Sequence, residues 1–269
     1  MKTKSLLAAF AVICFQSYAG TTEFVPIQQR AQGHSLAGAS LFNDSLFSNP
    51  ASSAFTNVYT VDGTFLNLKT FAVSILDTKT SALGGAMGYY RILRPGFDQA
   101  IQVAKVGTSG RLSENFGFGV AAKAAWGPDL AGTSASYKDV DFGMIAKFDF
   151  IQVGVNINNV FGGSGPMGEA REYATGARFG WEDTMFFSAS VSGETATFRP
   201  TQFGFGAEYV SPYYFALKGG FRMRPIDEKS FWGAGLSINS PKVLINYAVE
   251  FENRGGGSIE QSVGTTFLF

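Results

Sequence analysis

The sequence is short of the residues that most catalytic and metal sites need. It holds one cysteine, Cys14, and one histidine, His34. Cys14 falls in the N-terminal segment that we expect to be removed after export. The rest of the chain therefore has no cysteine for a disulfide, a thiolate metal ligand or a nucleophile. A Ser-His-Asp triad would have to use His34, for which hydrogen bonds to nearby backbone are the favoured interpretation. We predict no enzyme activity, no cofactor and no metal site.

Long hydrophobic runs and a charge excess are also missing. Charges or glycines interrupt every apolar run beyond the N-terminal segment, so no later stretch offers the ~20 consecutive apolar residues of a membrane helix. Lysine plus arginine and aspartate plus glutamate number 21 each. This balance argues against a nucleic-acid partner. If the chain crosses a membrane, it does so as a β-barrel.

The N-terminus has the pattern of an export signal. Met1–Lys4 is basic, Ser5–Phe15 is apolar but too short to span a bilayer, and Ser17 and Ala19 are small residues at the −3 and −1 positions of a cleavage site. We predict a signal peptide over residues 1–19.

Residues 20–56 differ from the chain that follows. They show little alternation, are rich in small residues, and contain Asn49-Pro50, which interrupts any helix. Such a segment suits a compact plug, or hatch, better than a barrel wall. The predicted organisation is a hatch over residues 20–56 inside a transmembrane barrel over residues 57–269.

From Asn57 onward the hydrophobic period is two. In residues 139–148, one side carries Val140, Phe142, Met144, Ala146 and Phe148, and the other carries Asp139, Asp141, Gly143, Ile145 and Lys147. Apolar residues that alternate with charge and glycine are typical of a lipid-facing wall around a polar interior. Such runs number roughly twelve to fourteen, with fourteen favoured, and an even count brings both chain termini to the periplasmic side. The predicted fold is all-β, a transmembrane antiparallel barrel of about 14 strands with an N-terminal plug.

Two runs are ambiguous, residues 82–92 and 98–106. One register of the second would turn Lys105 toward lipid, which costs ~2–4 kcal/mol at the bilayer midplane. We therefore expect Lys105 near a rim or in the opposite register.

The alternation also predicts a set of charged side chains inside the barrel. They are Lys123, Asp139, Asp141, Lys147, Arg178, Glu208, Lys218, Arg222 and Glu250. Because both signs are present, a pairing network against the plug is the favoured interpretation, and a polar path for cargo is the alternative.

Glycines recur within the predicted strands, at residues 116–119 and 203–206 in the pattern Phe-Gly-Phe-Gly. They are not nucleotide-binding loops, because those lie between a strand and a helix. We expect them to make room for the hatch.

The last strand resembles the signal by which the outer-membrane assembly machinery recognises its barrels. Ser262, Gly264, Phe267 and Phe269 fit that polar-x-Gly-x-x-aromatic-x-aromatic pattern. The resemblance implies a bacterial outer-membrane protein, with the assembly machinery and outer-membrane lipid as partners.

The hatch segment contains Ala37-Gly38-Ala39, Asn43-Asp44-Ser45 and Asn49-Pro50-Ala51, and residues 155–162 form a second motif within the predicted barrel. These motifs resemble those of the FadL-type transport barrels and their smaller PorV-type relatives. The matching motif residues are Gly38, Ala39, Asp44, Asn49, Pro50 and Ala51. The resemblance implies a fourteen-stranded barrel with a hatch and passive transport of small hydrophobic, fatty-acid-like molecules. The alternative is a PorV-like barrel that docks secretion or surface proteins, which the short predicted loops favour.

Overall fold

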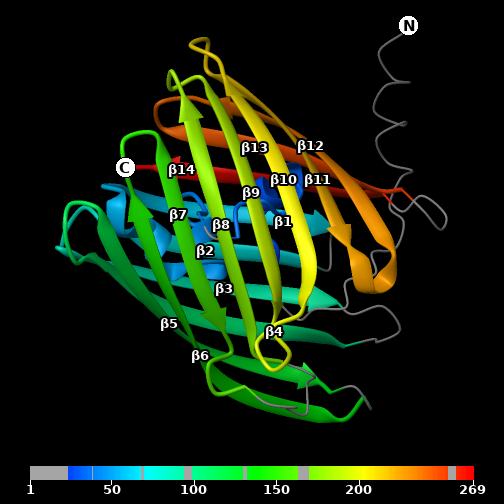
Figure 1. The fold of residues 1–269 in the computed structure, drawn as a ribbon. Coiled ribbons are helices and arrows are strands. Elements are labelled where there is room, and N and C mark those ends of the chain that lie inside the picture. The colour runs from blue at the N-terminus through cyan, green and yellow to red at the C-terminus, as the bar shows by residue number, and fades with distance from the viewer. Residues whose placement is uncertain are drawn as a thin grey trace, which may run out of the picture.

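The computed structural model describes residues 24–37, 39–67, 70–93, 99–129, 132–162, 170–253 and 259–269. Within them the chain forms one closed barrel of antiparallel strands, β1 to β14, around a short N-terminal segment (Figure 1). The all-β barrel of fourteen strands predicted from the alternation is confirmed. The predicted signal peptide, residues 1–19, lies outside the described residues.

Each strand pairs with its neighbours in sequence, and β1 pairs with β14 from Thr60 opposite Leu268 to Phe65 opposite Val263. This last pairing closes the sheet and removes its free edges. The strands are β1 (Tyr59–Asn67), β2 (Thr70–Asp77), β3 (Leu83–Leu93), β4 (Ala100–Arg111), β5 (Phe116–Pro128), β6 (Ser134–Lys147), β7 (Ile151–Asn158), β8 (Glu172–Trp181), β9 (Met185–Glu194), β10 (Pro200–Val210), β11 (Phe215–Arg224), β12 (Lys229–Asn239), β13 (Val243–Glu252) and β14 (Ile259–Leu268).

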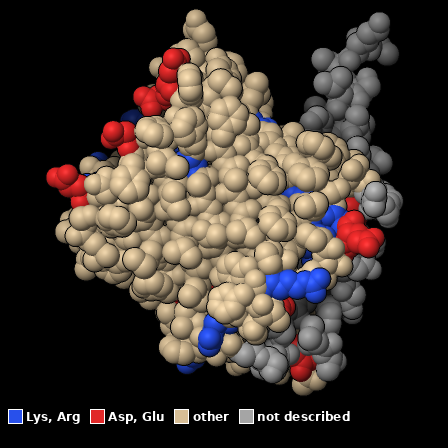
Figure 2. Space-filling model, in the orientation of Figure 1, with Lys and Arg blue, Asp and Glu red and all other residues tan. Residues whose placement is uncertain are grey.

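The wall is apolar outside and mixed inside. On β5, Phe116 and Trp126 are exposed on the outer face, whereas Gly117 and Lys123 are buried on the inner face. Figure 2 shows that the broad middle of one outer face carries few charges, and that most of the charged side chains in view lie toward its edges. An apolar band of this kind is costly in water and stable against lipid. No helix in the described part of the chain is long and apolar enough to cross a membrane.

The final strand keeps the predicted alternation. Val263, Phe267 and Phe269 are exposed on the outside, while Ser262, Gly264 and Thr266 are buried. The role of this strand in assembly stays a prediction.

Residues 24–37 and 39–56 lie inside the barrel and are together called the plug below (Figure 1, blue). The plug contains α2 (Ile27–Ala31), α3 (Asp44–Phe47) and the 3-10 helix η1 (Pro50–Phe55); a second 3-10 helix, η2 (Pro225–Asp227), joins β11 to β12. α2 packs against β11 to β14, and η1 packs against β3 to β7. The plug therefore bridges opposite parts of the wall.

Strand glycines let the plug backbone approach the wall. A Cβ added at Gly204 would lie 2.5 Å from the carbonyl oxygen of Gly33, and one added at Gly220 would lie 2.1 Å from the carbonyl carbon of Gln32. Real Cβ atoms do not tolerate such distances. The prediction that strand glycines make room for the hatch is confirmed.

An apolar core joins the plug to β3, β4 and β5. The ring of Phe24 lies 5.4 Å from that of Phe47 and 5.8 Å from that of Tyr90, between ring centres. Ile101 and Val103 on β4 are fully buried in the same cluster. Here the inner face of the wall is apolar because the plug, rather than water, covers it.

Candidate functional site

Most of the buried charges in the described part of the chain form three groups on the inner face of the wall and on the plug. The Glu250 group contains Arg30, His34, Arg222, Glu250 and Glu260. The Glu208 group contains Arg178, Glu208 and Lys218. The Asp141 group contains Lys105, Lys123 and Asp141. In each group an acid is within ion-pair distance of more than one basic side chain.

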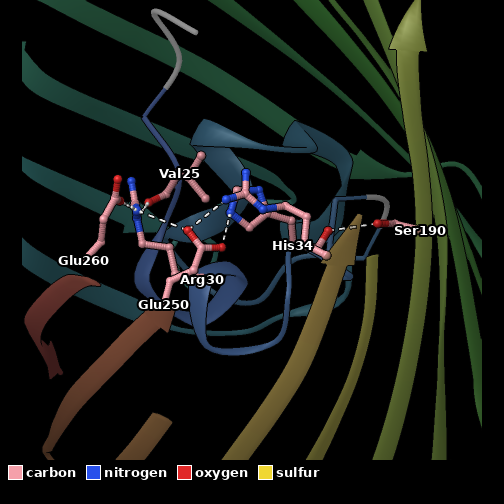
Figure 3. A network of polar contacts seen from close by, with 7 residues as sticks. Val25, Arg30, His34, Ser190, Glu250 and Glu260 are labelled. Atoms are coloured by element: carbon pink, nitrogen blue, oxygen red, sulfur yellow. Dashed lines mark hydrogen bonds and ion pairs between the residues drawn. The ribbon is translucent and has the colours of Figure 1, made fainter. Parts of the chain in front are cut away.

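The Glu250 group ties the plug to β11, β13 and β14 (Figure 3). Arg222 Nη2 donates to Glu250 Oε2 at 2.9 Å, and His34 Nε2 lies 3.5 Å from Glu250 Oε1. Arg30 Nη1 lies 3.9 Å from Glu250 Oε2, and Arg30 also pairs with Glu260. Arg30 and His34 belong to the plug, and Arg222 belongs to β11. The Glu250 carboxylate on β13 therefore contacts both the plug and the wall.

His34 sits at a tight turn of the plug, with a left-handed backbone at φ 58°. Its carbonyl oxygen accepts a hydrogen bond from Ser190 Oγ at 2.8 Å. Burial first, and the charge of Arg222 second, lower the pKa of the imidazole from 6.5 to about 4, although Glu250 opposes the shift. His34 is therefore neutral at ordinary pH, and the two arginines carry the positive charge of the group.

The Glu208 group lies on β8, β10 and β11. Arg178 Nη2 donates to Glu208 Oε2 at 3.0 Å, and Lys218 Nζ lies 3.7 Å from Glu208 Oε1. Lys218 also donates to Ser237 Oγ at 2.7 Å and to Gln28 Oε1 in the plug at 3.1 Å. This lysine is thus held by both the wall and the plug.

The Asp141 group lies on β4, β5 and β6. Lys105 Nζ lies 2.7 Å from Asp141 Oδ2, and Lys123 Nζ lies 2.9 Å from Asp141 Oδ1. Asp141 also accepts the backbone N–H of Asn159 at 2.9 Å. Of the two positions expected for Lys105, the inward register is observed and the rim is not, because the ion pair offsets the cost of burying the ammonium.

Most charges predicted for the interior lie in or beside these groups. Those that are buried are Lys123, Asp139, Asp141, Glu208, Lys218, Arg222 and Glu250, and Arg178 is partly buried. Lys147 differs, because it is the last residue of β6 and its side chain is exposed. At a strand end the inward register no longer implies burial.

Sequence reasoning missed several buried polar groups. Arg30 and Glu260 pair across the plug boundary, and Asp62 on β1 accepts a hydrogen bond from Thr266 Oγ1 at 2.6 Å. No spacing rule relates a plug residue to its partner on the wall. The buried face of β1, by contrast, could have been found from the alternation of Thr60, Asp62 and Thr64.

One residue of the predicted hatch motif, Asn49, contacts the wall. Asn49 Nδ2 lies within hydrogen-bond distance of the Met144 carbonyl at 3.3 Å and the Val155 carbonyl at 3.4 Å. Asn49 Oδ1 accepts the backbone N–H of Ala51 at 3.0 Å and so caps η1, with Pro50 in its first turn. Ala39, Asp44, Pro50 and Ala51 are buried. Gly38 lies outside the described residues.

A cavity of about 380 Å³, the mouth cavity, is lined in part by the Glu250 group. The plug residues Arg30 and His34 contribute to its lining, and strand ends supply Glu172, Glu194 and Glu252. These strand ends lie at the end of the barrel opposite Phe269. No cluster of possible metal ligands occurs among the described residues.

The fold is shared with solved transport barrels. CymD, a monoaromatic hydrocarbon channel, superposes with a TM-score of 0.73 at 11% identity, over 94% of this chain and 99% of that chain. The Pseudomonas putida toluene transporter TodX has a TM-score of 0.66 at 10% identity, over 92% and 97%. A Pseudomonas aeruginosa FadL homologue has a TM-score of 0.58 at 13% identity, over 91% and 97%.

No protein-family model and no curated protein matches the sequence. At these identities the structural similarity establishes the fold, which is that of the FadL-type barrels.

Proposed function

We propose that this chain, which has the FadL-type fold over nearly its whole length, is a bacterial outer-membrane barrel for the passive transport of small hydrophobic molecules. The observation that carries the proposal is the match to CymD over 94% of this chain and 99% of that one. Two of the similar structures, CymD and TodX, are described as a monoaromatic hydrocarbon channel and a toluene transporter. The apolar outer wall supports a membrane location.

The two ends of the barrel support one orientation. The end that carries Phe269 has short turns, such as residues 148–150, 182–184 and 240–242. The longest connection, residues 159–171, is at the opposite end, where the mouth cavity opens. Outer-membrane barrels place short turns in the periplasm and longer loops outside. The mouth cavity therefore faces the exterior in the proposed orientation.

The size of the mouth cavity favours small cargo. Its volume of about 380 Å³ is near the lower end of the roughly 300–1,000 Å³ range of small-molecule sites. Directly beneath it, paired charges and the plug occupy the interior. Cargo that enters the mouth must therefore displace part of the plug or move beside it.

Uptake assays test the proposal. Cells that produce the chain should take up labelled toluene or decanoic acid several-fold faster than cells that lack it, with no change for a hydrophilic sugar. The plug can be tethered with the double variant Ser35→Cys/Ser188→Cys, because these hydroxyl groups already form a hydrogen bond between plug and wall. Oxidation should slow uptake, a reductant should restore it, and neither single-cysteine variant should respond. Equal uptake with and without the protein would refute the proposal.

The polar-path alternative is tested by conductance. Because Lys218 and Arg222 are paired and packed against the plug, neutralising them with Lys218→Met and Arg222→Gln should leave single-channel current and ion selectivity unchanged. Altered selectivity would show that these charges line an ion path.

A PorV-like docking barrel is the second candidate. It is favoured by the brevity of most connections between the described strands, which leaves little chain for an external capture groove. Affinity purification from outer-membrane extracts, with a barrel of similar size as control, should recover a specific secretion or surface protein if docking is the function. Recovery of none, together with hydrophobic uptake, would favour transport.

A further inference from the structure

The outer face of the wall is hollowed from β1 to β6. The depression, here called the outer hollow, has a volume of about 860 Å³ and an almost entirely apolar lining. Its middle is formed by Ala104, Ala122 and Ala124, and larger side chains such as Met87 and Tyr89 stand beside them. Strand pairing places Ala104 opposite Ala124, so small residues meet across neighbouring strands. The hollow exists because these methyl groups leave space that the flanking side chains do not fill.

The outer hollow does not open into the barrel. The pairing of β3 with β4 and of β4 with β5 continues without a register shift from end to end. Behind it, the plug fills the interior: a Cβ added at Gly88 would lie 2.9 Å from Leu46 Cδ2 and 2.9 Å from Phe47 Cζ. The hollow is therefore a separate site on the lipid-facing surface, distinct from the mouth cavity.

Two cations stand at the end of the hollow nearer the mouth. Lys138 on β6 lines it and is exposed. Arg91 on β3 is two residues beyond Tyr89 and shares its outward face. Neither forms an ion pair with a carboxylate in the part of the chain that the structure describes. β3 and β6 are three strand spacings apart, ~14 Å, and Arg91 is two residues, ~7 Å, further along its strand than the position level with Lys138, so the two backbone positions are ~16 Å apart.

The surroundings of these cations are those of a membrane interface. Tyr89 Oη donates to Gln102 Oε1 at 2.7 Å, and the ring of Trp126 lies 6.4 Å from that of Tyr89. Tyrosine and tryptophan gather where lipid head groups meet the acyl region. From this level the hollow extends toward the apolar residues Val106 and Ile75. Charged groups at the interface and an apolar depression below them match the two parts of a lipid.

We propose that the outer hollow binds an outer-leaflet lipid that carries two phosphates and acyl chains. One chain lies over the alanines, and one phosphate contacts each of Lys138 and Arg91. A lipid with a single phosphate satisfies only one cation, and a zwitterionic lipid adds its own positive charge beside them. The orientation of the site rests on the proposed outer-membrane function, but lipid binding and hydrophobic uptake are measured separately.

Native mass spectrometry of the full, detergent-solubilised protein tests the site. Diphosphoryl lipid A should bind with one tight site, in preference to monophosphoryl lipid A and to phosphatidylcholine. Lys138→Gln and Arg91→Gln should each weaken the diphosphoryl lipid about fivefold and remove its advantage over the monophosphoryl lipid. Ala122→Phe, which fills the hollow, should weaken all three lipids.

Two variants remote from the hollow serve as controls. Lys147→Gln removes an exposed cation at the opposite end of β6, and Ala189→Phe enlarges an exposed outward alanine on β9. Both should bind like the unmodified chain, and slower migration on heating should show that every variant is folded. Equal affinity for the diphosphoryl lipid and phosphatidylcholine, or unchanged binding in the Lys138→Gln/Arg91→Gln variant, would overturn the proposal. Such a result alongside intact toluene uptake would remove the lipid site and leave the transport function standing.

Discussion

Gly119 on β5 faces Pro50 of the plug so closely that a Cβ added at Gly119 would lie 2.3 Å from the Pro50 carbonyl carbon. The nearest atoms at this position are backbone, which cannot rotate away as a flexible side chain can. The wall and the plug are therefore fitted to one another at the level of main chain. Any side chain at residue 119 must move η1 or bend β5.

Replacing Gly119 by valine should release the plug from β5 while the barrel still closes, because the strand pairs on both sides of residue 119 do not depend on the plug. The plug should then become sensitive to limited proteolysis, and ion conductance should rise. The matched control is Gly63→Val on β1, since a Cβ there meets nothing within 4 Å. Identical protease resistance in the two variants would contradict the close fit.

Arg222 and Glu250 form a buried pair whose members depend on each other. Removing one leaves an uncompensated charge inside the barrel, so Arg222→Met alone should cost about 3–5 kcal/mol of unfolding free energy. Arg222→Met combined with Glu250→Leu should cost less than the sum of the single changes. Denaturant unfolding in lipid vesicles measures this. The more exposed pair of Arg224 and Asp227 is the control, where Arg224→Gln should cost about 0–1 kcal/mol. Additive losses at Arg222 and Glu250 would contradict the coupling.

His34 should make the protein less stable in acid. Burial and Arg222 hold its pKa near 4 in the folded chain against 6.5 when unfolded, so the unfolded state binds the proton more readily between these values. The stabilisation is complete above pH 6.5 and is lost as the pH falls toward 4, by up to about 3 kcal/mol. The charged groups that face the ring are Arg30, Arg222 and Glu250. His34→Gln should flatten the stability profile between pH 6.5 and 4; an unchanged slope would refute this origin.

Asp44 should act in the opposite direction. Burial first, and the charge of Asp62 second, raise the pKa of Asp44 well above its usual range, although Lys218 opposes this. A carboxyl group whose pKa is raised by folding favours the folded state at low pH, and that contribution is lost as the pH rises through the folded-state pKa.

At neutral pH, Asp44→Asn should therefore stabilise the protein by about 1–3 kcal/mol, with little effect at pH 4. Asp149→Asn, at an exposed turn, is the control and should be neutral at both values. Thermal unfolding of the Asp44→Asn and Asp149→Asn variants at several pH values measures this difference. A destabilised Asp44→Asn variant at pH 7 would contradict the argument.

The sequence predicted the wall better than the contents of the barrel. Alternation located β5 and β6 because lipid faces one side and small or charged residues face the other. On β4 the pattern is weaker, since Ile101 and Val103 point inward against the plug while Gln102 points outward. An apolar interior contact thus inverts the rule that polar residues face the lumen.

Contacts between distant segments were out of reach. Glu208 and Lys218 are directly opposite on β10 and β11, so a correct hairpin register would have paired them. Arg30 and Glu260 have no such rule, because they are 230 positions apart in the sequence and belong to a helix and a strand that no hairpin connects. The outer hollow likewise depends on alanines from neighbouring strands meeting at one height, and no single run of residues contains that information.

The C-terminal Phe269 offers a test that separates assembly from stability. Its backbone N–H donates to the Tyr59 carbonyl at 3.0 Å, and its ring lies 5.5 Å from that of Tyr59, so it belongs to the seam between β14 and β1. The ring is largely exposed, and its removal should cost the folded barrel little. If Phe269 is part of an assembly signal, Phe269→Ala should lower the amount of folded protein in the outer membrane several-fold, while refolding of the purified chain in detergent stays near normal.

Phe148→Ala is the control, because Phe148 is also exposed and contacts one aromatic ring, that of Phe116, at 6.2 Å. Equal losses of folded protein in cells for both variants would contradict a signal at Phe269. They would show that exposed aromatic side chains are needed in general, whatever their position in the chain.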